Sequence, residues 1–499
     1  MKQVQTALLV AGAFCLTAIT TLAQSEPVST ASVTVTLDLK HPGAAIPENF
    51  IGLSFETSLL LPNENGWRYF RPDNQPLINL LHTLGVKSLR IGGNTSDRDA
   101  KQLPGPADWD SLFGFAKAAG VKVIYCLQLH NGDPQVAAQT VKYIMDRYAP
   151  LVDCFSIGQE PSAYPVAKVD NRPESERMES VTHQTFAACA GEWKRFADAI
   201  IAAVPEVKFC GPGVHNDSLW ARKFIGNFGS ANHVALITEH LYPGGAGGKV
   251  PTPEIGRQRM LSDDFIKTYQ KLHDGFVPLA AANGLPYRLE EVNNFYNGGA
   301  AGVSDTFAAA LWGTDFMYWW AEHGAAGLNF HTGDHVAAGS RLVASKYTAF
   351  FSIANGYAVR PLSYGIKLFE LGSHGNFIPS STINPEKCNV SVHAVLGENQ
   401  NVYVTVINKE LGTNARTAKL VINLGDNRFA DAESMRMTGF ANAVSPREKT
   451  VLGEDEIHED GSWYGKWTAL ASASGRDAEA SKFQVELAPA SAIIIRFTK

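Results

Sequence analysis

The feature that most constrains the fold is an alternation of short apolar segments with longer amphipathic ones, which runs from Phe50 to about Gly372. The short segments are rich in β-branched and aromatic residues, and the longer segments repeat apolar residues at helical spacing. We expect strands at Phe50–Phe55, Val86–Gly92, Val121–Leu129, Asp153–Gly158, Lys208–Val214, Val234–His240, Tyr287–Glu291 and Gly327–His331. We expect helices at Gln75–Leu84, Asp108–Ala119, Gln135–Tyr148, Phe186–Val204, Leu219–Phe228, Leu261–Ala282, Thr306–His323 and Tyr364–Leu371. Eight strand–helix repeats in succession predict an α/β fold, a parallel (β/α)8 TIM barrel.

The remainder of the chain has a different pattern. Short β-rich segments separated by Gly, Asn and Asp turns predict strands at Val390–Leu396, Val402–Ile407, Ala418–Ile422 and Ser491–Phe497. Ser32–Leu39 alternates like a single strand ahead of the barrel, and a single strand needs partners. We therefore predict an N-terminal segment at 24–48, a catalytic barrel at 49–374, and an accessory antiparallel β-sandwich at 375–499 that the N-terminal strand completes.

The first 23 residues have the pattern of a signal peptide. Lys2 supplies the positive charge, Ala7–Ile19 is apolar, and Thr21-Leu22-Ala23 is a plausible cleavage site. The alternative is a membrane anchor, but the apolar stretch is shorter than the roughly 20 residues that span a bilayer. We expect a secreted or periplasmic protein with no membrane association after cleavage.

The net charge of the chain and the spacing of its possible metal ligands limit what it is expected to bind. A formal net charge of −6 argues against binding to nucleic acid or to an acidic membrane surface. Four histidines that could suggest a metal, at positions 130, 240, 331 and 335, come mostly from different strands and lack a recurrent ligand spacing. We expect neither a metal nor a cofactor.

Two of the predicted strands end in glutamate. Glu160 follows the fourth strand, and Glu290 and Glu291 end the seventh. Carboxylates at the C-terminal ends of barrel strands occupy the catalytic face, and a facing pair is the equipment of a glycosidase. For Glu160 the alternative is a solvated loop residue; Pro161 is expected to restrict it to an extended conformation.

Alternation along the seventh strand forces a choice between the two adjacent glutamates, because one should face the barrel mouth and the other the helices. Arg288 shares a face with Glu290. A Glu290–Arg288 pair behind the barrel would leave Glu291 facing inward, although the pattern alone leaves both possibilities open.

The segments Gln159-Glu160-Pro161 and Glu291 to Ala300, with Ser304 to Ala308, resemble glycoside hydrolase family 79, which contains β-glucuronidases and heparanase. The resemblance implies Glu160 as acid/base and Glu291 as nucleophile, since the family nucleophile precedes a tyrosine by five residues, here Tyr296. It also implies that Tyr296, Asn297 and Gly298 bind a sugar carboxylate. The further sugar-binding positions it implies are Glu56, Asn94, Gln159, His240, Tyr242 and His335.

One position departs from the family pattern. Residue 159 is glutamine where the family has asparagine, whose amide bonds the sugar 2-hydroxyl. The longer side chain could keep that contact with a shifted sugar or lose it.

The resemblance implies a secreted retaining β-glycosidase, an exo-acting β-glucuronidase whose partner is a β-glucuronide or a glycan containing glucuronic acid. The alternatives are a β-glucosidase or β-galactosidase with the same mechanism, an endo-acting heparanase-like hydrolase, and a carbohydrate-binding protein without catalysis. The last requires loss of one catalytic glutamate, and both are present.

Overall fold

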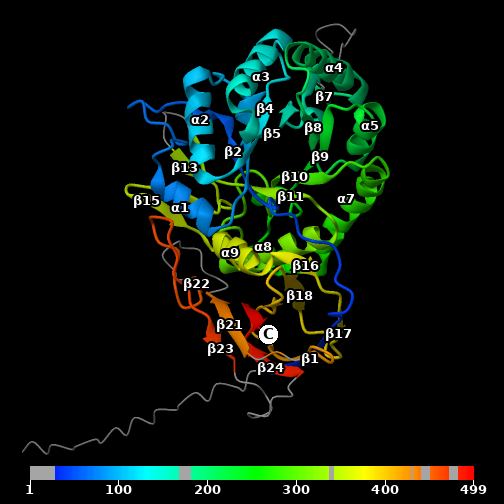
Figure 1. Ribbon diagram of the computed structural model, residues 1–499, viewed down its shortest axis with the longest axis vertical. Helices are drawn as coiled ribbons and strands as arrows, with labels where there is room; N and C mark the ends of the chain where they lie inside the picture. The colour runs from blue at the N-terminus through cyan, green and yellow to red at the C-terminus, as the bar shows by residue number, and fades with distance from the viewer. Residues whose placement is uncertain are drawn as a thin grey trace, which may run out of the picture.

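The computed structural model describes residues 29–167, 181–336, 342–427, 429, 431–439, 450–470 and 481–498. A helix-covered barrel forms one lobe, and stacked sheets form the other (Figure 1). The predicted signal peptide lies outside the described residues. Within the described ranges no helix has both the length and the apolar character needed to cross a bilayer.

In the described part of the chain, eight parallel strands close a barrel in sequence order, and the last strand pairs with the first. The strands are β2 (Ile51–Glu56), β3 (Ser88–Gly92), β4 (Lys122–Leu127), β5 (Val152–Ile157), β8 (Phe209–His215), β9 (Val234–Leu241), β10 (Tyr287–Val292) and β11 (Gly327–His331). Their side chains are almost all buried, because one face fills the barrel and the other packs on helices. The predicted barrel is confirmed.

Helices surround the barrel in the positions that the sequence predicts. They are α1 (Gln75–Thr83), α2 (Pro106–Ala119), α3 (Pro134–Tyr148), α4 (Phe186–Ala203), α5 (Ser218–Phe228), α6 (Pro253–Met260), α7 (Asp263–Ala282), α8 (Phe307–Glu322) and α9 (Pro361–Gly372). The helix predicted from Leu261 begins at Asp263, because the Ser262 side chain accepts a hydrogen bond from the Asp264 N–H and caps it. The short α6 precedes this cap and was not predicted.

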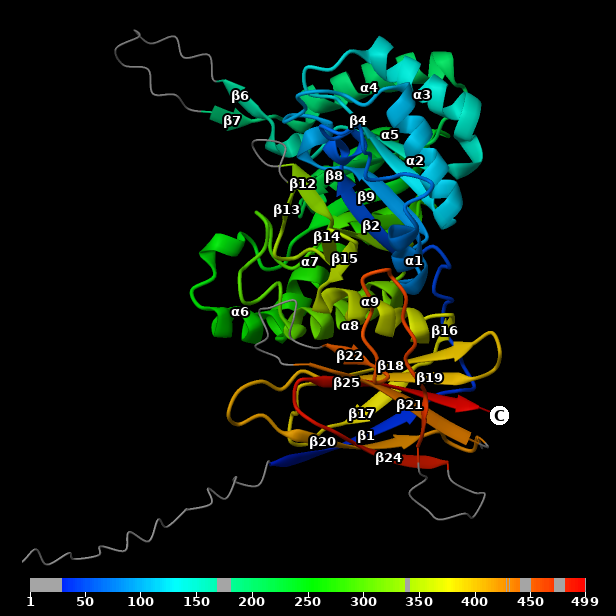
Figure 2. The ribbon, with the colours of Figure 1, turned by 90° about the vertical axis from the view of Figure 1, so that its left-hand side faces the viewer.

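Short antiparallel strand pairs extend from the barrel. They are β6 (Pro165–Ala167) with β7 (Val181–His183), β12 (Asp334–Val336) with β13 (Leu342–Ala344), and β14 (Phe350–Ile353) with β15 (Gly356–Val359). The β6–β7 pair and α6 extend from the same side of the barrel (Figure 2).

The second lobe is a sandwich of two sheets. The smaller sheet has the order β17 (Ser380–Ile383), β1 (Thr30–Leu37), β20 (Thr417–Asn423), β24 (Lys482–Leu487). The larger has the order β16 (Gly375–Phe377), β18 (Val390–Gly397), β19 (Val402–Asn408), β25 (Ser491–Thr498), β21 (Asp431–Thr438), β22 (Val451–Leu452), with β23 (Thr468–Ala469) beside β21. The sandwich is not wholly antiparallel as predicted, because β1 pairs in parallel with β20.

The larger sheet is buried on both faces. Ile493 and Ile495 of β25 pack on the smaller sheet, whereas Ala492 and Ile494 belong to the core that includes the barrel helices. This two-sided burial explains the continuous apolar run at the end of the chain. Helices α8 and α9 lie between the barrel and this sheet (Figure 2).

A charged cluster joins α8 to the sandwich. His393 of β18 places Nδ1 2.9 Å from Glu322 and Nε2 2.9 Å from Asp315, and the Lys409 ammonium lies 2.8 Å from Asp315. The Tyr318 ring stacks on the His393 ring with centroids 4.5 Å apart. The imidazole is thus held between two carboxylates of the barrel.

Candidate active site

The two glutamates that the sequence singles out meet at the rim where the parallel strands end. Glu160 follows β5, and Glu291 lies in β10. One carboxylate oxygen of each, together with a ring nitrogen of His240, lie within 4.8 Å of one another. Parallel strands end at a common rim, so residues distant in sequence converge there.

Both consecutive glutamates of β10 point into the barrel. Glu290 accepts a hydrogen bond of 2.8 Å from the Thr238 hydroxyl, and Glu291 accepts one of 2.7 Å from Arg90 Nη1. The register of β10 against β9 shifts between Leu289 and Glu291, which marks a β-bulge. A bulge inserts an extra residue and interrupts the alternation of faces. The prediction that the two glutamates face opposite sides was wrong.

The predicted pair between Glu290 and Arg288 behind the barrel was also wrong. Arg288 donates to Asn329 Oδ1 at 2.7 Å and to the carbonyls of Asn49 and Phe50, near the N-terminal end of β2. Glu290 instead lies beneath Glu291, inside the barrel. Of the two, Glu291 is the more accessible, with 8% of its side chain exposed against 1% for Glu290.

Three donors hold the Glu291 carboxylate. Arg90 Nη1 lies 2.7 Å and Gln159 Nε2 3.1 Å from Oε2, and the Tyr242 hydroxyl lies 2.9 Å from Oε1. Burial favours the protonated acid, but the positive charges of His331, His240 and Arg90 outweigh it. The pKa of Glu291 is therefore held well below its usual value, and the group is an anion at neutral pH.

Glu160 adopts a conformation that the sequence did not suggest. Its backbone is left-handed, with φ 47° and ψ 57°, rather than extended as Pro161 led us to expect. Its N–H donates to the Gly213 carbonyl at 3.0 Å, which helps to hold this costly conformation. The side chain contacts His240 Nδ1 at 3.1 Å through Oε1 and Arg98 Nη2 at 3.2 Å through Oε2.

Glu160 and His240 each stabilise the charged form of the other. Burial alone would raise the pKa of Glu160. The hydrogen bond and the charge of His240 together outweigh burial, so the pKa of Glu160 lies below its usual value. Burial lowers the pKa of His240, but the Glu291 charge, the hydrogen bond to Glu160 and the Glu290 carboxylate 3.6 Å from Nε2 raise it to about 9. In the free protein at neutral pH the two groups thus form an ion pair.

Glu160, His240 and Glu291 have the atom types and proximity of a metal site. A guanidinium already contacts each carboxylate, Arg90 at 2.7 Å from Glu291 and Arg98 at 3.2 Å from Glu160. These fixed positive charges would repel a divalent cation placed between the carboxylates. The donor set therefore fits a metal poorly.

Glu56 is the last residue of β2, and Asn94 begins a short 3-10 helix after β3. Glu56 Oε2 accepts from the Thr95 N–H at 3.0 Å, and Oε1 lies 3.6 Å from His331 Nε2. Asn94 Oδ1 accepts from Arg98 Nη2 at 2.8 Å. His331 Nδ1 is also 3.9 Å from Glu291 Oε2, so Glu56 is tied to the catalytic rim through His331.

The Gln159 amide is directed at two neighbours within the site. Its Oε1 accepts from Arg90 Nη2 at 2.5 Å while its Nε2 donates to Glu291. The longer side chain thus bridges Arg90 and Glu291, and its second N–H is the group left to reach a sugar hydroxyl.

The turn after β10 contains the residues that, by the family resemblance, bind a sugar carboxylate. The centroid of the Tyr296 ring lies 5.3 Å from that of the His215 ring and 6.2 Å from that of the Tyr242 ring. Asn297, Gly298 and the following glycine have φ of 57°, 78° and 84°. Among the described residues none of their N–H groups has an acceptor. Successive N–H groups of this kind can bind an anion.

The remaining predicted position follows the last barrel strand. His335 lies in β12, but its side chain is outside the described part of the structure.

Several residues at the rim were not identified from the sequence. Arg90 is fully buried and contacts Glu291, Gln159 and Ser54. A charge inside the apolar segment Leu89–Ile91 is a signal that could have revealed it, since a buried charge requires partners. Arg98, His215 and Tyr347 lie in loops or at strand ends, where pattern gives little guidance.

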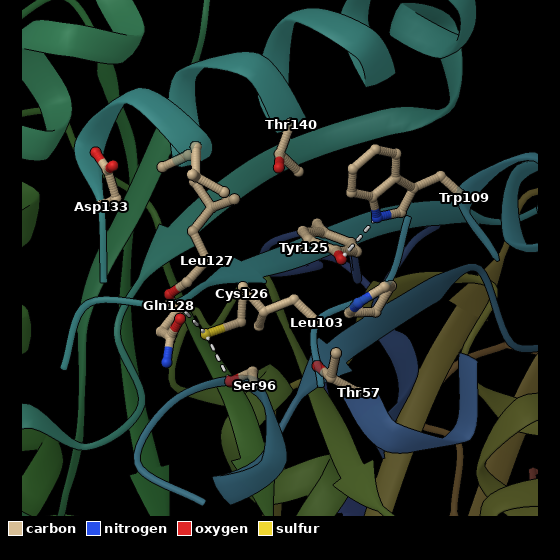
Figure 3. A pocket seen from close by; sticks show the side chains of 13 residues that line it. Thr57, Ser96, Leu103, Trp109, Tyr125, Cys126, Leu127, Gln128, Asp133 and Thr140 are labelled. Carbon is tan, nitrogen blue, oxygen red and sulfur yellow. Dashed lines mark hydrogen bonds between the residues drawn. The ribbon is translucent and has the colours of Figure 1, made fainter. Parts of the chain in front are cut away.

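A cavity of about 40 Å³ lies elsewhere, between α2, α3 and β4 (Figure 3). In it Trp109 Nε1 donates to the Tyr125 hydroxyl at 2.9 Å, and the Ser96 hydroxyl donates to Cys126 Sγ at 3.2 Å. Neither Glu160 nor Glu291 lines it. It is therefore separate from the candidate active site.

Comparison with known proteins agrees with the fold. No family model matches the chain. Among curated proteins it is 27% identical over 311 residues to a β-glucuronidase of Aspergillus niger (strain ATCC MYA-4892 / CBS 513.88 / FGSC A1513), an alignment that covers 52% of this chain and 54% of the relative. The chain thus matches about half the length of that relative.

Solved structures give a fuller overlap. A 4-O-α-L-rhamnosyl-β-D-glucuronidase from Fusarium oxysporum 12S has a TM-score of 0.68 and 17% identity, with 93% of this chain and 99% of that chain covered. A GH51 arabinofuranosidase from Xanthomonas axonopodis pv. citri has a TM-score of 0.63 and 14% identity, with 94% and 100% covered. At such low identity these likenesses establish the barrel with its β-sandwich and no more.

Proposed function

We propose that this protein is a glycoside hydrolase that cleaves β-linked sugars with retention of anomeric configuration. The observation that carries the proposal is the carboxylate pair, with oxygens of Glu160 and Glu291 within 4.8 Å of each other at the catalytic rim. Retaining glycosidases hold their two carboxyl groups about 5–5.5 Å apart, whereas inverting enzymes need roughly 6.5–9.5 Å to admit a water.

Glu291 is the nucleophile of the proposed reaction. It is ionised and held in place by Arg90 and by the Tyr242 hydroxyl, so its free lone pair can attack the anomeric carbon. The attack breaks the bond to the leaving oxygen and gives an α-linked glycosyl-enzyme. Water then displaces Glu291 and restores the β configuration.

Glu160 is the acid/base. It donates a proton to the leaving oxygen in the first step and removes one from water in the second. In the free protein it is ionised, but His240, whose raised pKa keeps it protonated at neutral pH, places Nδ1 3.1 Å from Oε1. The ion pair thus contains the proton that the first step requires.

For the sugar we propose a β-glucuronide, cleaved from the chain end. The curated relative bears the name β-glucuronidase. The positive-φ turn at 297–299 offers N–H groups without acceptors in the described chain, beside Tyr296. These groups suit a C6 carboxylate because backbone N–H groups bind an anion without a Lys or Arg. We also propose export, which rests on the composition of residues 1–23.

A neutral-sugar β-glycosidase is the second candidate. The observation that favours it is that Arg90 and Arg98, two guanidinium groups at the described rim, each pair with a catalytic carboxylate. Neither is then free to bind a substrate carboxylate.

The test is a panel of p-nitrophenyl glycosides with three variants. We expect the β-glucuronide to be cleaved far faster than the β-glucoside, and Tyr296→Phe to reduce only the former. Glu291→Gln should abolish turnover with binding retained. Glu160→Ala should lose activity and regain it with azide, giving a β-glycosyl azide.

Each outcome bears on one part of the proposal. Equal kcat/KM on the two sugars would favour the neutral-sugar candidate. An α-azide product would exclude the double displacement. Inactivity on the whole panel would overturn glycoside hydrolysis on simple substrates.

A further inference from the structure

Glu290 is a buried carboxylate that the proposed reaction does not use. Its side chain is 1% exposed, and its hydrogen bond of 2.8 Å comes from the Thr238 hydroxyl. A Cβ at position 213 would lie 2.7 Å from its Oε1, so Gly213 provides room for it. Taking an anion out of water is costly, and this one therefore requires a compensating charge.

His240 stands between Glu290 and the proposed acid/base. Its Nδ1 lies 3.1 Å from Glu160 Oε1, and its Nε2 lies 3.6 Å from Glu290 Oε1. The imidazole is fully buried, and each ring nitrogen faces a different carboxylate. Both nitrogens carry a proton only when the ring is cationic. The geometry is that of a cation between two anions.

Other charged groups surround these three. Arg90 Nε is 3.9 Å from Glu290 Oε2, but its Nη1 lies much closer to Glu291, at 2.7 Å. Arg98 contacts Glu160. Three further titratable groups face this cluster. Burial keeps His215 on β8 and Glu239 on β9 in their neutral forms, because it lowers the pKa of His215 and raises that of Glu239 well above its usual value. Cys210 on β8 places Sγ 3.9 Å from Glu290 Oε2.

We propose that Glu290 is a positioning residue for the acid/base step, which holds His240 through Nε2 so that the Nδ1 proton is the one exchanged with Glu160. This role rests on the proposed glycosidase mechanism. Before the leaving group departs, the Nδ1 proton crosses to Glu160 Oε1, and Glu160 passes a proton to the leaving oxygen. During hydrolysis of the glycosyl-enzyme Glu160 takes a proton from water and returns it to Nδ1, which closes the cycle.

The fall of kcat/KM at high pH should therefore reflect the titration of the Glu160–His240 pair rather than that of Glu160 alone. Proton donation persists until His240 loses its proton, at a pKa of about 9. Removing the Glu290 charge should lower the pKa of His240, because an opposite charge within about 4–6 Å changes a pKa by about 1–3. The basic limb should then move to lower pH.

The experiment compares wild type with Glu290→Gln across pH 5 to 10. For p-nitrophenyl β-glucuronide we expect the basic limb of kcat/KM to fall by about one pH unit or more. With a 2,4-dinitrophenyl leaving group, which needs little protonation, the limb should not move. The matched control is Glu239→Gln, the same substitution at a buried neighbour that accepts from the Asp217 N–H at the start of α5 and that burial keeps protonated, so no charge is removed. It should leave the limb in place.

A second measurement does not depend on activity. In ¹⁵N-histidine-labelled protein, the His240 signals can be assigned by their absence in His240→Gln. In wild type they should show both ring nitrogens protonated at pH 7, and in Glu290→Gln the ring should lose a proton at lower pH than in wild type. A neutral His240 in wild type would overturn the proposal, as would an unmoved limb. If Glu290→Gln does not fold, the wild-type spectrum decides. If no glycoside is cleaved while the spectra are as expected, the proposed function fails and the Glu290–His240 contact stands.

Discussion

The charged cluster between α8 and the sandwich predicts a pH dependence of stability that one substitution removes. His393 is 8% exposed and lies 2.9 Å from both Asp315 and Glu322. Burial lowers its pKa, but the Glu322 charge and the bonds to both carboxylates raise it, to about 9. In the unfolded chain the pKa of histidine is about 6.5.

The magnitude follows from linkage. A folded pKa above the unfolded one means that the native state binds the proton more tightly, so the stabilisation is complete below about pH 6.5 and is lost as pH rises through about 9. At about 1.4 kcal/mol per pH unit, the interval between these two values corresponds to about 3 kcal/mol. Solvent screening reduces this little because the imidazole is buried.

The assay is guanidinium unfolding of wild type and His393→Gln at pH 6 to 10. The difference in free energy of unfolding between the two proteins should shrink by about 3 kcal/mol across this range. Groups common to both proteins cancel in the difference. His374→Gln is the matched control, because His374 pairs with Glu370 but has 62% of its side chain exposed, so the change should be small. A difference that stays constant with pH would refute the assignment of a protonated His393.

Two further predictions concern the rim. Tyr242→Phe removes the hydroxyl that donates to Glu291 at 2.9 Å. Since a hydrogen bond to a charged group contributes about 1.5–3 kcal/mol, we expect kcat on p-nitrophenyl substrates to fall by about 10- to 100-fold with little change in KM. An undiminished kcat would count against Glu291 as nucleophile. Extended dialysis against EDTA should leave activity unchanged, because Arg90 and Arg98 already neutralise the carboxylates; loss of activity restored by a divalent metal would reverse that inference.

The barrel could be predicted from the sequence because its signal is repeated. Each strand is a short apolar run ahead of a helix, and eight repeats leave few alternatives. The rim was predictable to the extent that Glu160 closely follows β5 and Glu291 lies near the end of β10. Tyr242 and His240 lie beside them because β9 neighbours β10.

The local backbone at the two glutamates was not predictable. The bulge in β10 turns Glu290 and Glu291 into the same interior, against the period of two that a regular strand imposes. The left-handed conformation of Glu160 likewise opposes the preference set by Pro161. Both conformations depend on neighbours that are distant in sequence, such as Gly213, and such contacts leave no trace in a local pattern.

The parallel pairing of β1 with β20 has a consequence for the order in which the chain is made. The register joins Thr30 to Thr417, and these residues are 387 positions apart. At about 5–20 residues per second, β1 leaves the ribosome roughly 20 to 80 s before its partner exists. During that interval a strand with one apolar face and unpaired edges is open to association with other chains. The barrel can close on its own strands while translation continues, whereas the smaller sheet can form only once the last strands have emerged.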